Sequence, residues 1–267
     1  MVNLFIRRKE RNDMSQIFIK DAQQIEGIRK ANQAVANLLK RIKPYVKPGV
    51  TTKSLDELIH SWMLEEGLVS GSLNYGNPPF PGASCISINH VVCHGIPGDR
   101  ALKEGDIVNI DICLSKDGYF GDSSQMFCVG EVSILAQRLV DVTYECMMLG
   151  IEVVKPGVPF REIGRVIEKH AHAHNYSVVQ DFCGHGVGLS LHEAPQVLHY
   201  DSPMVRDIMA PGMIFTIEPM INVGKPGVKV LNDGWTAVTR DRSLTAQWEH
   251  AVLVTETGYE ILSLPTE

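Results

Sequence analysis

The sequence predicts an α+β protein made of two copies of one unit, related by a pseudo-twofold axis. Two stretches recur at nearly one offset: residues 154–158 repeat residues 46–50, and residues 211–218 echo residues 104–111. Each half reads helix, Lys-Pro-Gly turn, helix, loop, strands, and a strand that ends in a carboxylate. We therefore expect antiparallel strands to meet at the axis, with helices behind them.

Composition narrows the class of protein. Of the 267 residues, 44% are hydrophobic and 21% are charged, as is usual for globular proteins. The net charge is −6, so no overall field attracts nucleic acid, and no apolar run approaches the roughly 20 residues that span a membrane. Six cysteines without a Cys-x-x-Cys pair favour reduced thiols in a cytoplasm over a disulfide framework or a zinc knuckle.

Residues 1–14 are interpreted as a flexible N-terminal arm. The segment from Arg7 to Arg11 is strongly basic, and the apolar part before it is too short for a signal peptide. We interpret the arm as solvated, and contact with RNA or another acidic partner is the alternative.

The first half begins with two helices. Asp21 and Gln24 have capping-box spacing, an apolar stripe follows, and Pro44 ends the first helix. A cap within residues 51–54 starts the second helix, which Gly67 closes.

Loops and strands follow, and then the pattern repeats. Residues 70–83 are rich in Gly, Ser, Asn and Pro and form a predicted loop, and residues 84–92 are predicted to be a strand. In the second half Ser133 caps a predicted helix, a further helix has Phe160 on its apolar side, and residues 246–254 read as a strand.

The stretch 105–124 reads as a hairpin around an Asp-Gly turn at residues 117–118. Pairing about this turn puts Asp122 opposite Cys113, with Asp111 two residues along on the same face. The two carboxylates become diagonal neighbours, roughly 7–8 Å apart at the backbone. Two carboxylates aimed at one point repel unless a proton or a metal lies between them. The alternative is that one of them faces solvent or ends a strand.

Two further acids are candidates because of the repeat. Glu218 occupies the place of Asp111 in the second half, also at a strand end. Glu249 lies within the predicted strand 246–254 and becomes a candidate as a fourth acid on a sheet that already has three.

Histidines supply candidate nitrogen ligands and donors. His185 and His192 are seven apart and would face opposite sides of a continuous strand, but Gly186 and Gly188 permit a bend that brings both into one cleft. His94 follows a strand directly and is placed at a loop. A structural histidine is the alternative for each of the three.

His170 and His174 also share a helix face at the spacing of a metal-binding pair. They fall near the end of a predicted helix, where imidazolium complements the helix dipole. We therefore favour a structural role for this run and expect it to be separate from the acids.

The combined set is mostly hard oxygen with one nitrogen, and four carboxylates can neutralise two divalent ions. That composition suits Mn, Fe(II), Co or Zn better than a thiolate-rich site would. Two such ions, about 3.5–4 Å apart and bridged by carboxylates and a water, generate hydroxide at neutral pH and polarise a carbonyl. The implied reaction is metal-assisted amide hydrolysis.

Several motifs in order closely resemble type I methionine aminopeptidases over about residues 15–262. They occupy residues 92–97, 105–111, 184–186, 215–220 and 232–236. The resemblance implies the duplicated "pita-bread" fold, one catalytic metallopeptidase domain over residues 15–267, and removal of the initiator methionine from nascent chains whose second residue is small.

The resemblance also implies the roles of the metal-site residues. Asp111 chelates one ion, Asp122 and Glu249 bridge both, and His185 and Glu218 complete the second. Glu218 in addition handles the proton of the bridging water.

By the same resemblance, His192 stabilises the scissile carbonyl as it becomes tetrahedral, and His94 hydrogen-bonds the peptide nitrogen. Four residues map near the methionine pocket: Cys85, Phe80, Tyr75 and Trp235. A monovalent cation is expected near Asn89, Val91 and Thr245. The expected partners are nascent N-termini and, as a contact, the ribosome; the expected state is a cytoplasmic monomer without membrane or specific nucleic-acid binding.

Two rival interpretations remain. Proline aminopeptidases and creatinase-like enzymes share the fold but carry a large additional N-terminal domain. A non-enzymatic binding protein of this fold loses metal ligands, whereas here all five positions are filled.

Overall fold

The computed structural model describes residues 16–266, so the predicted arm of residues 1–14 lies outside the described part of the chain. The elements of the first half are α1 (Ala22–Ile42), the short 3-10 helix η1 (Lys43–Tyr45), α2 (Thr52–Glu65), β1 (Val69–Ser70), β2 (Cys85–Ile88), β3 (Val91–Cys93), β4 (Ile107–Lys116) and β5 (Tyr119–Cys128).

The second half again begins with two helices and continues with strands. Its elements are α3 (Ile134–Glu152), α4 (Arg161–Ala173), β6 (Ser177–Val178), β7 (Gly184–Gly186), β8 (Glu193–Val197), β9 (Ile214–Ile217), β10 (Met220–Asn222), β11 (Val228–Val230), β12 (Ala237–Thr239), β13 (Thr245–Gln247), β14 (His250–Val254) and β15 (Tyr259–Ile261). The predicted order of helix pair and strands in each half is confirmed.

Local sequence explains where the helices begin. The Asp21 side chain accepts a hydrogen bond from the Gln24 N–H at 2.9 Å, and the Gln24 side chain accepts one from the Asp21 N–H. The predicted capping box is therefore present. The Thr51 side chain caps α2 by accepting from the Ser54 N–H, and the Ser133 side chain caps α3 by accepting from the Ala136 N–H. These caps satisfy N–H groups that the first helical turn leaves unpaired.

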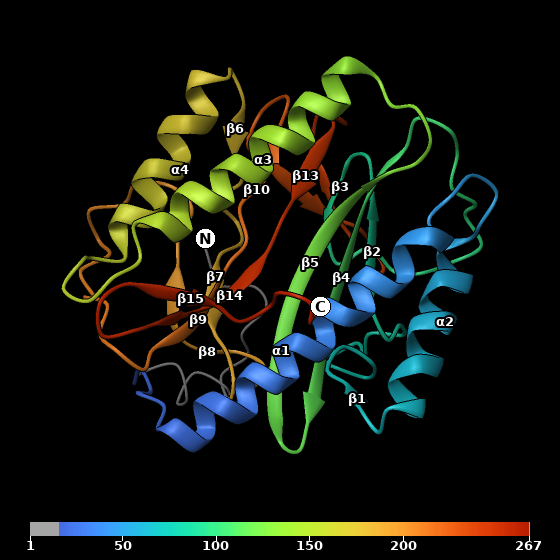
Figure 1. The fold of residues 1–267 in the computed structure, drawn as a ribbon. Coiled ribbons are helices and arrows are strands. Elements are labelled where there is room, and N and C mark those ends of the chain that lie inside the picture. The colour runs from blue at the N-terminus through green and yellow to red at the C-terminus, as the bar shows by residue number, and fades with distance from the viewer. Residues whose placement is uncertain (1–15, 267) are drawn as a thin grey trace.

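The strands form antiparallel sheets, as expected. One sheet has the order β1-β4-β2 with β5 on β4, and a second has the order β15-β14-β9-β7-β8. Two smaller sheets, β13-β10-β6 and β11-β12-β3, lie beside them, and the last combines strands from both halves. Figure 1 shows α1 and α3 lying across the strands of their own halves. The predicted α+β class is confirmed.

Each half buries its own apolar cluster between helices and strands. In the first half, side chains such as Leu38, Leu55 and Ile110 are fully buried between α1, α2 and the hairpin. In the second, Leu139 and Phe215 lie in the cluster that joins α3 and α4 to β9. These layers hold Asp111 within β4 and Asp122 within β5, so the strand end expected at Asp111 is wrong, because β4 continues to Lys116; Glu218 does follow the end of β9.

Two predicted strands are wrong in detail. The strand expected over residues 84–92 breaks at Asn89, whose φ of 55° turns the chain between β2 and β3. The strand expected over residues 246–254 is interrupted at Trp248 and Glu249, so β13 and β14 belong to different sheets. Periodicity does not reveal such breaks, because apolar residues continue on both sides of them.

Within residues 16–266, none of the helices combines the length and the apolar character needed to cross a membrane.

Candidate active site

The β4–β5 hairpin carries the first two acids in the predicted register. Cys113 is paired with Asp122, and Asp111 is paired with Ser124, so the two carboxylates are diagonal neighbours. Asp117 and Gly118 have φ values of 52° and 84°, as the turn requires. The register prediction is confirmed, because the turn type fixes the pairing of every residue that follows.

The second half brings two more acids to the same place. Glu218 follows β9 directly, and Glu249 precedes β14. Glu249 is fixed to the hairpin through its backbone: its N–H donates to the Ser124 carbonyl at 3.2 Å, and its carbonyl accepts from the Ser123 hydroxyl at 2.6 Å. The break in the predicted strand therefore turns Glu249 toward β5.

His185 lies among these acids. Its Nε2 is 3.6 Å from an oxygen of Asp122 and 3.6 Å from an oxygen of Glu218. Ligand atoms of Asp122, His185 and Glu249 all lie within 4.8 Å of one another. Strand β7, which carries His185, pairs with β9, so the residue reaches the cluster from the second half.

His192 joins the cluster by a turn rather than by a bent strand. Strands β7 and β8 pair antiparallel, and His192 lies just before β8. The rings of His185 and His192 are consequently 4.4 Å apart between centroids. The turn between β7 and β8 therefore brings together two histidines that are seven residues apart, and Gly188 in this turn adopts φ +139°.

Burial raises the pKa of all four carboxyls, and neighbouring carboxylates raise those of Asp122, Glu218 and Glu249 further. Four such groups stay ionised together only beside compensating positive charge. Burial also lowers the pKa of His185 to about 4, which leaves a neutral imidazole able to act as a ligand.

The thiols nearby do not alter this donor set. Cys85 faces Asp111 across the β2–β4 ladder, and burial together with the charge of Asp111 raises its pKa well above the ordinary value. A protonated thiol is a poor ligand. The donors are therefore four carboxylates and one imidazole, which fit divalent cations of the Mn, Fe(II), Co or Zn type.

A small set of polar side chains that sequence reasoning missed holds Glu218. The Thr216 hydroxyl donates to Glu218 Oε1 at 2.8 Å, and the Gln247 amide donates to Oε2 at 3.2 Å. The Glu218 N–H donates to His199 Nε2 at 3.1 Å. Thr216 precedes Glu218 by two residues, a same-face position that the strand pattern alone could have singled out.

An aromatic wall borders the acids. Trp235 has edge-to-face contacts with Phe80 at 5.3 Å and with His94 at 6.0 Å between ring centroids. His94 also meets Phe182 at 5.6 Å, a residue that the sequence did not single out. The Trp235 indole donates to the Pro78 carbonyl at 2.9 Å, which fixes the loop of residues 75–82 against the wall.

Tyr75 connects the aromatic wall to His192. Its hydroxyl lies 2.8 Å from His192 Nδ1, and its ring is 6.5 Å from that of Trp235. The structure therefore brings the sequence-predicted residues into one connected group: Asp111, Asp122, His185, Glu218, Glu249, His94, His192, Cys85, Phe80, Tyr75 and Trp235. His170, His172 and His174 instead lie at the end of α4.

A buried ion pair beside His192 was also missed. The Lys20 ammonium lies 2.6 Å from the Glu193 carboxylate, and both residues are 3% exposed or less. The other Glu193 oxygen accepts from the N–H groups of Leu189 and Ser190 at 2.6 and 2.7 Å. The pair spans 173 positions of sequence, a distance at which no local pattern could have paired them.

The three residues predicted near a monovalent cation lie around the first residue of β13, Thr245. The Thr245 N–H donates to the Asn89 carbonyl at 2.9 Å, and Val91, two residues after Asn89, begins β3. Within the described residues, the buried Thr245 hydroxyl has no hydrogen-bond partner.

Comparison with known proteins identifies the family. The model of metallopeptidase family M24 matches residues 26–256. The chain is 50% identical to the methionine aminopeptidase of Escherichia coli K12 over 250 residues, which cover 93% of this chain and 94% of the relative. It is 49% identical to the methionine aminopeptidase of Haemophilus influenzae, over 93% of each chain.

Solved structures agree. The crystal structure of methionine aminopeptidase from Rickettsia prowazekii has a TM-score of 0.91 and 46% identity, over 93% of this chain and 100% of that one. The prolidase of Pyrococcus furiosus shares the fold at a TM-score of 0.76, but with 22% identity and over 66% of its length. The chain therefore belongs to metallopeptidase family M24, within which it groups with the methionine aminopeptidases.

Proposed function

We propose that this protein is a metal-dependent aminopeptidase that removes the initiator methionine from nascent polypeptides whose second residue is small. The observation that carries the proposal is the convergence of four carboxylates and His185 beside an aromatic wall. The identity of 50% to a protein named methionine aminopeptidase supports the same activity.

We assign the metal-binding roles as follows. Asp111 would hold one divalent ion, His185 and Glu218 would hold a second, and Asp122 and Glu249 would be shared between them. When bound, two divalent ions lower the pKa of water and polarise the scissile carbonyl. The ions are of the Co, Mn, Fe(II) or Zn class, because hard oxygen dominates the donors.

Side chains of the protein transfer the proton and hydrogen-bond the substrate. Glu218 accepts the proton of the attacking water, and the hydrogen bonds from Thr216 and Gln247 support this role by fixing both of its oxygens. His192 donates to the carbonyl oxygen as negative charge develops there, and His94 hydrogen-bonds the peptide nitrogen.

The methionine side chain lies against Cys85, Phe80, Tyr75 and Trp235. Aromatic edges and a thiol suit a thioether, which is polarisable and only weakly polar. Phe182 extends this surface through its contact with His94.

Further assignments belong to the same proposal. A monovalent cation beside Asn89, Val91 and Thr245 would give the unpaired Thr245 hydroxyl a partner. Residues 15–267 act as one catalytic domain. The protein works as a cytoplasmic monomer and meets its substrates as they leave the ribosome, with contact to the ribosome itself.

Hydrolysis of Met-Ala-Ser, Met-Lys-Ser and proline-containing peptides with defined metals tests the substrate class. We expect release of methionine from Met-Ala-Ser and little from Met-Lys-Ser. A preference for proline-containing peptides would instead favour a prolidase-like activity.

Substitution of the hairpin acids tests the site. Asp111→Asn and Asp122→Asn should each abolish metal-dependent activity and leave the circular dichroism spectrum near that of the wild type. Asp117→Asn is the matched control, since it removes an exposed acid from the turn of the same hairpin and Asn also accepts positive φ. Full metal occupancy and normal turnover in both site variants would refute the assignment.

A further inference from the structure

A second group of metal-binding side chains lies on the outer surface, where α3 and α4 pack together. Glu145 belongs to α3, His170 to α4, and His174 directly follows α4. Each of the three offers one ligand atom, and these atoms all lie within 4.8 Å of one another. None of the three residues has a role in the proposed peptidase reaction.

The two histidines are arranged for chelation by the helix itself. His170 and His174 are four positions apart and so lie on one face, with ring centroids separated by 4.6 Å. Their position at the end of α4 had favoured a purely structural role, because imidazolium complements the helix dipole there. That explanation requires nothing from a neighbouring helix.

The tertiary structure adds what the sequence could not show. Glu145, 25 positions away, places a carboxylate oxygen 2.7 Å from His170 Nε2. A carboxylate from one helix now faces two imidazoles from another. Three protein ligands of this kind leave a fourth tetrahedral position open to water, as borderline divalent ions accept.

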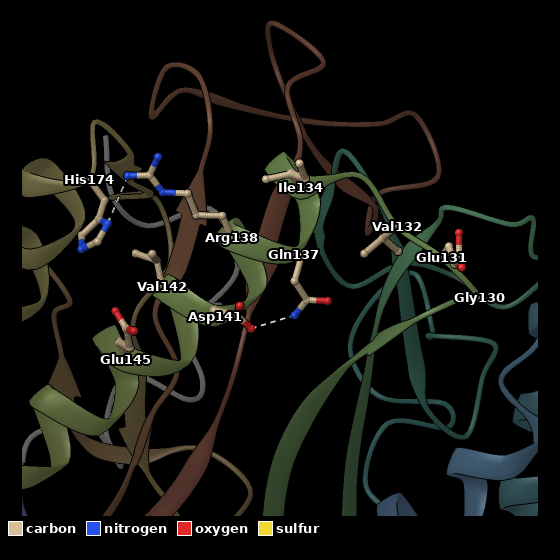
Figure 2. Close-up of a pocket in the computed structure, with 10 residues that line it drawn as sticks. All are labelled: Gly130, Glu131, Val132, Ile134, Gln137, Arg138, Asp141, Val142, Glu145 and His174. Atoms are coloured by element: carbon tan, nitrogen blue, oxygen red, sulfur yellow. Dashed lines mark hydrogen bonds between the residues drawn. The ribbon is translucent and has the colours of Figure 1, made fainter.

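The surroundings also favour a cation. Glu145 and His174 line an open surface groove of about 690 Å³, together with Glu131, Asp141 and Arg138. Figure 2 shows Glu145 and His174 at one end of the group of residues that line it. The groove is thus lined by three carboxylates (Glu131, Asp141 and Glu145) and one arginine, so its net charge is negative. Arg138 lies 3.5 Å from His174 Nδ1, and its side chain is exposed to solvent, which screens its charge.

We propose that Glu145, His170 and His174 form a surface site for one divalent cation of the Zn²⁺, Ni²⁺ or Cu²⁺ class, which links α3 to α4. Imidazole nitrogen with one carboxylate is a donor set that suits these ions and not Mg²⁺ or Ca²⁺. Because the ligands come together only in the folded chain, binding stabilises the fold.

Metal uptake tests this directly. The holoenzyme is dialysed against rising Zn²⁺, and bound zinc per chain is measured by elemental analysis. Wild type should bind one equivalent more than His170→Gln/His174→Gln, and Glu145→Gln should bind the extra ion more weakly. His172→Gln is the matched control: His172 is an exposed histidine of the same helix outside the cluster, and its variant should keep the extra equivalent. Equal uptake by all variants would overturn the proposal.

Two further readouts separate a site from general damage. Excess Zn²⁺ should raise the melting temperature of wild type and His172→Gln more than that of His170→Gln/His174→Gln. With Cu²⁺ as a probe, electron paramagnetic resonance should show coupling to two imidazole nitrogens that the double variant loses.

Peptide hydrolysis at stoichiometric metal should stay within a few-fold of wild type when all three histidines of the run are replaced by Gln. A fall of ~100-fold or more, the scale of a disturbed ligand shell, would assign the histidines to the reaction centre and overturn the proposal of a separate site.

Discussion

At the scale of single residues, the site depends on neutral groups held in fixed orientations. Burial, together with a smaller electrostatic contribution from His185, lowers the pKa of His94 to about 4, so His94 is a neutral donor and acceptor near pH 7. The Tyr75 hydroxyl lies 2.8 Å from His192 Nδ1, which leaves Nε2 free to face a substrate. Both histidines therefore act without a change of charge before the reaction.

His192→Ala tests the role of the second histidine. A donor aimed at a developing oxyanion contributes ~10²–10³ in kcat, or about 2.7–4 kcal/mol. We expect kcat to fall by that factor, with KM little altered and metal content unchanged. A variant that loses an ion would move His192 into the ligand set, and one that raises KM alone would assign it to ground-state binding.

At the scale of elements, two groups of polar contacts outside the acid cluster hold segments that the site requires. Lys20 precedes α1, and its ion pair with Glu193 holds the turn that ends in His192. Asp106 precedes β4 and accepts from the Asn89 amide at 2.7 Å and from the Lys103 N–H at 2.9 Å. Each contact joins an element terminus to a loop.

Lys20→Met should be strongly destabilising. It leaves the Glu193 carboxylate buried without its cation, a change that typically lowers the free energy of unfolding by ~3–5 kcal/mol. Urea unfolding measures the loss. Lys30→Met removes an exposed pair with Glu26, 3.6 Å apart, and should alter stability by ~1 kcal/mol or less. Equal effects of the two substitutions would contradict the importance of burial.

Asp106→Asn should show its effect through pH. Burial raises the pKa of Asp106, but the hydrogen bonds from Lys103 and Asn89 and the charge of Arg100 outweigh it, so the pKa is lowered overall. A lowered carboxyl pKa stabilises the fold above the unfolded value of about 3.9, and the contribution disappears as pH falls through the folded value.

The stability difference between wild type and Asp106→Asn should therefore be constant near neutral pH and shrink below about pH 4. Unfolding by denaturant at several pH values measures it. A difference that grows toward acid pH would show that the sign of the pKa shift is wrong.

At the scale of the whole molecule, the site joins the two halves of the chain. Asp111 and Asp122 come from the hairpin of the first half, whereas His185 comes from β7 and Glu218 and Glu249 from the ends of strands in the second half. Ions bound between them, as we propose, would cross-link the halves. Binding to the folded chain alone stabilises it by RT ln(1 + [L]/Kd), about 2.7 kcal/mol at 100 times Kd.

Removal of metal by a chelator should thus lower the melting temperature. The measurement is made in His170→Gln/His174→Gln protein, so that only the buried ions contribute. Asp111→Asn/Asp122→Asn introduced into that protein is the control and should respond little to the chelator. A melting temperature that chelation leaves unchanged would argue against ions bound between the halves.

The sequence by itself determined the repeat, the helix caps, the hairpin register and the family. These features depend on local chemistry: a cap needs a side chain within three residues, and an Asp-Gly turn fixes its own pairing. It also singled out the acids as candidates, because the hairpin register puts Asp111 and Asp122 on one face and the repeat gives Glu218 the place of Asp111.

Only the tertiary structure decided which distant groups meet. The break that turns Glu249 to the hairpin, the hairpin that brings His192 to His185, and the contact of Glu145 with His170 all join segments that no periodicity connects. The reason is physical: spacing along the chain fixes which face of an element a side chain occupies, whereas the packing of elements against one another decides what that face meets.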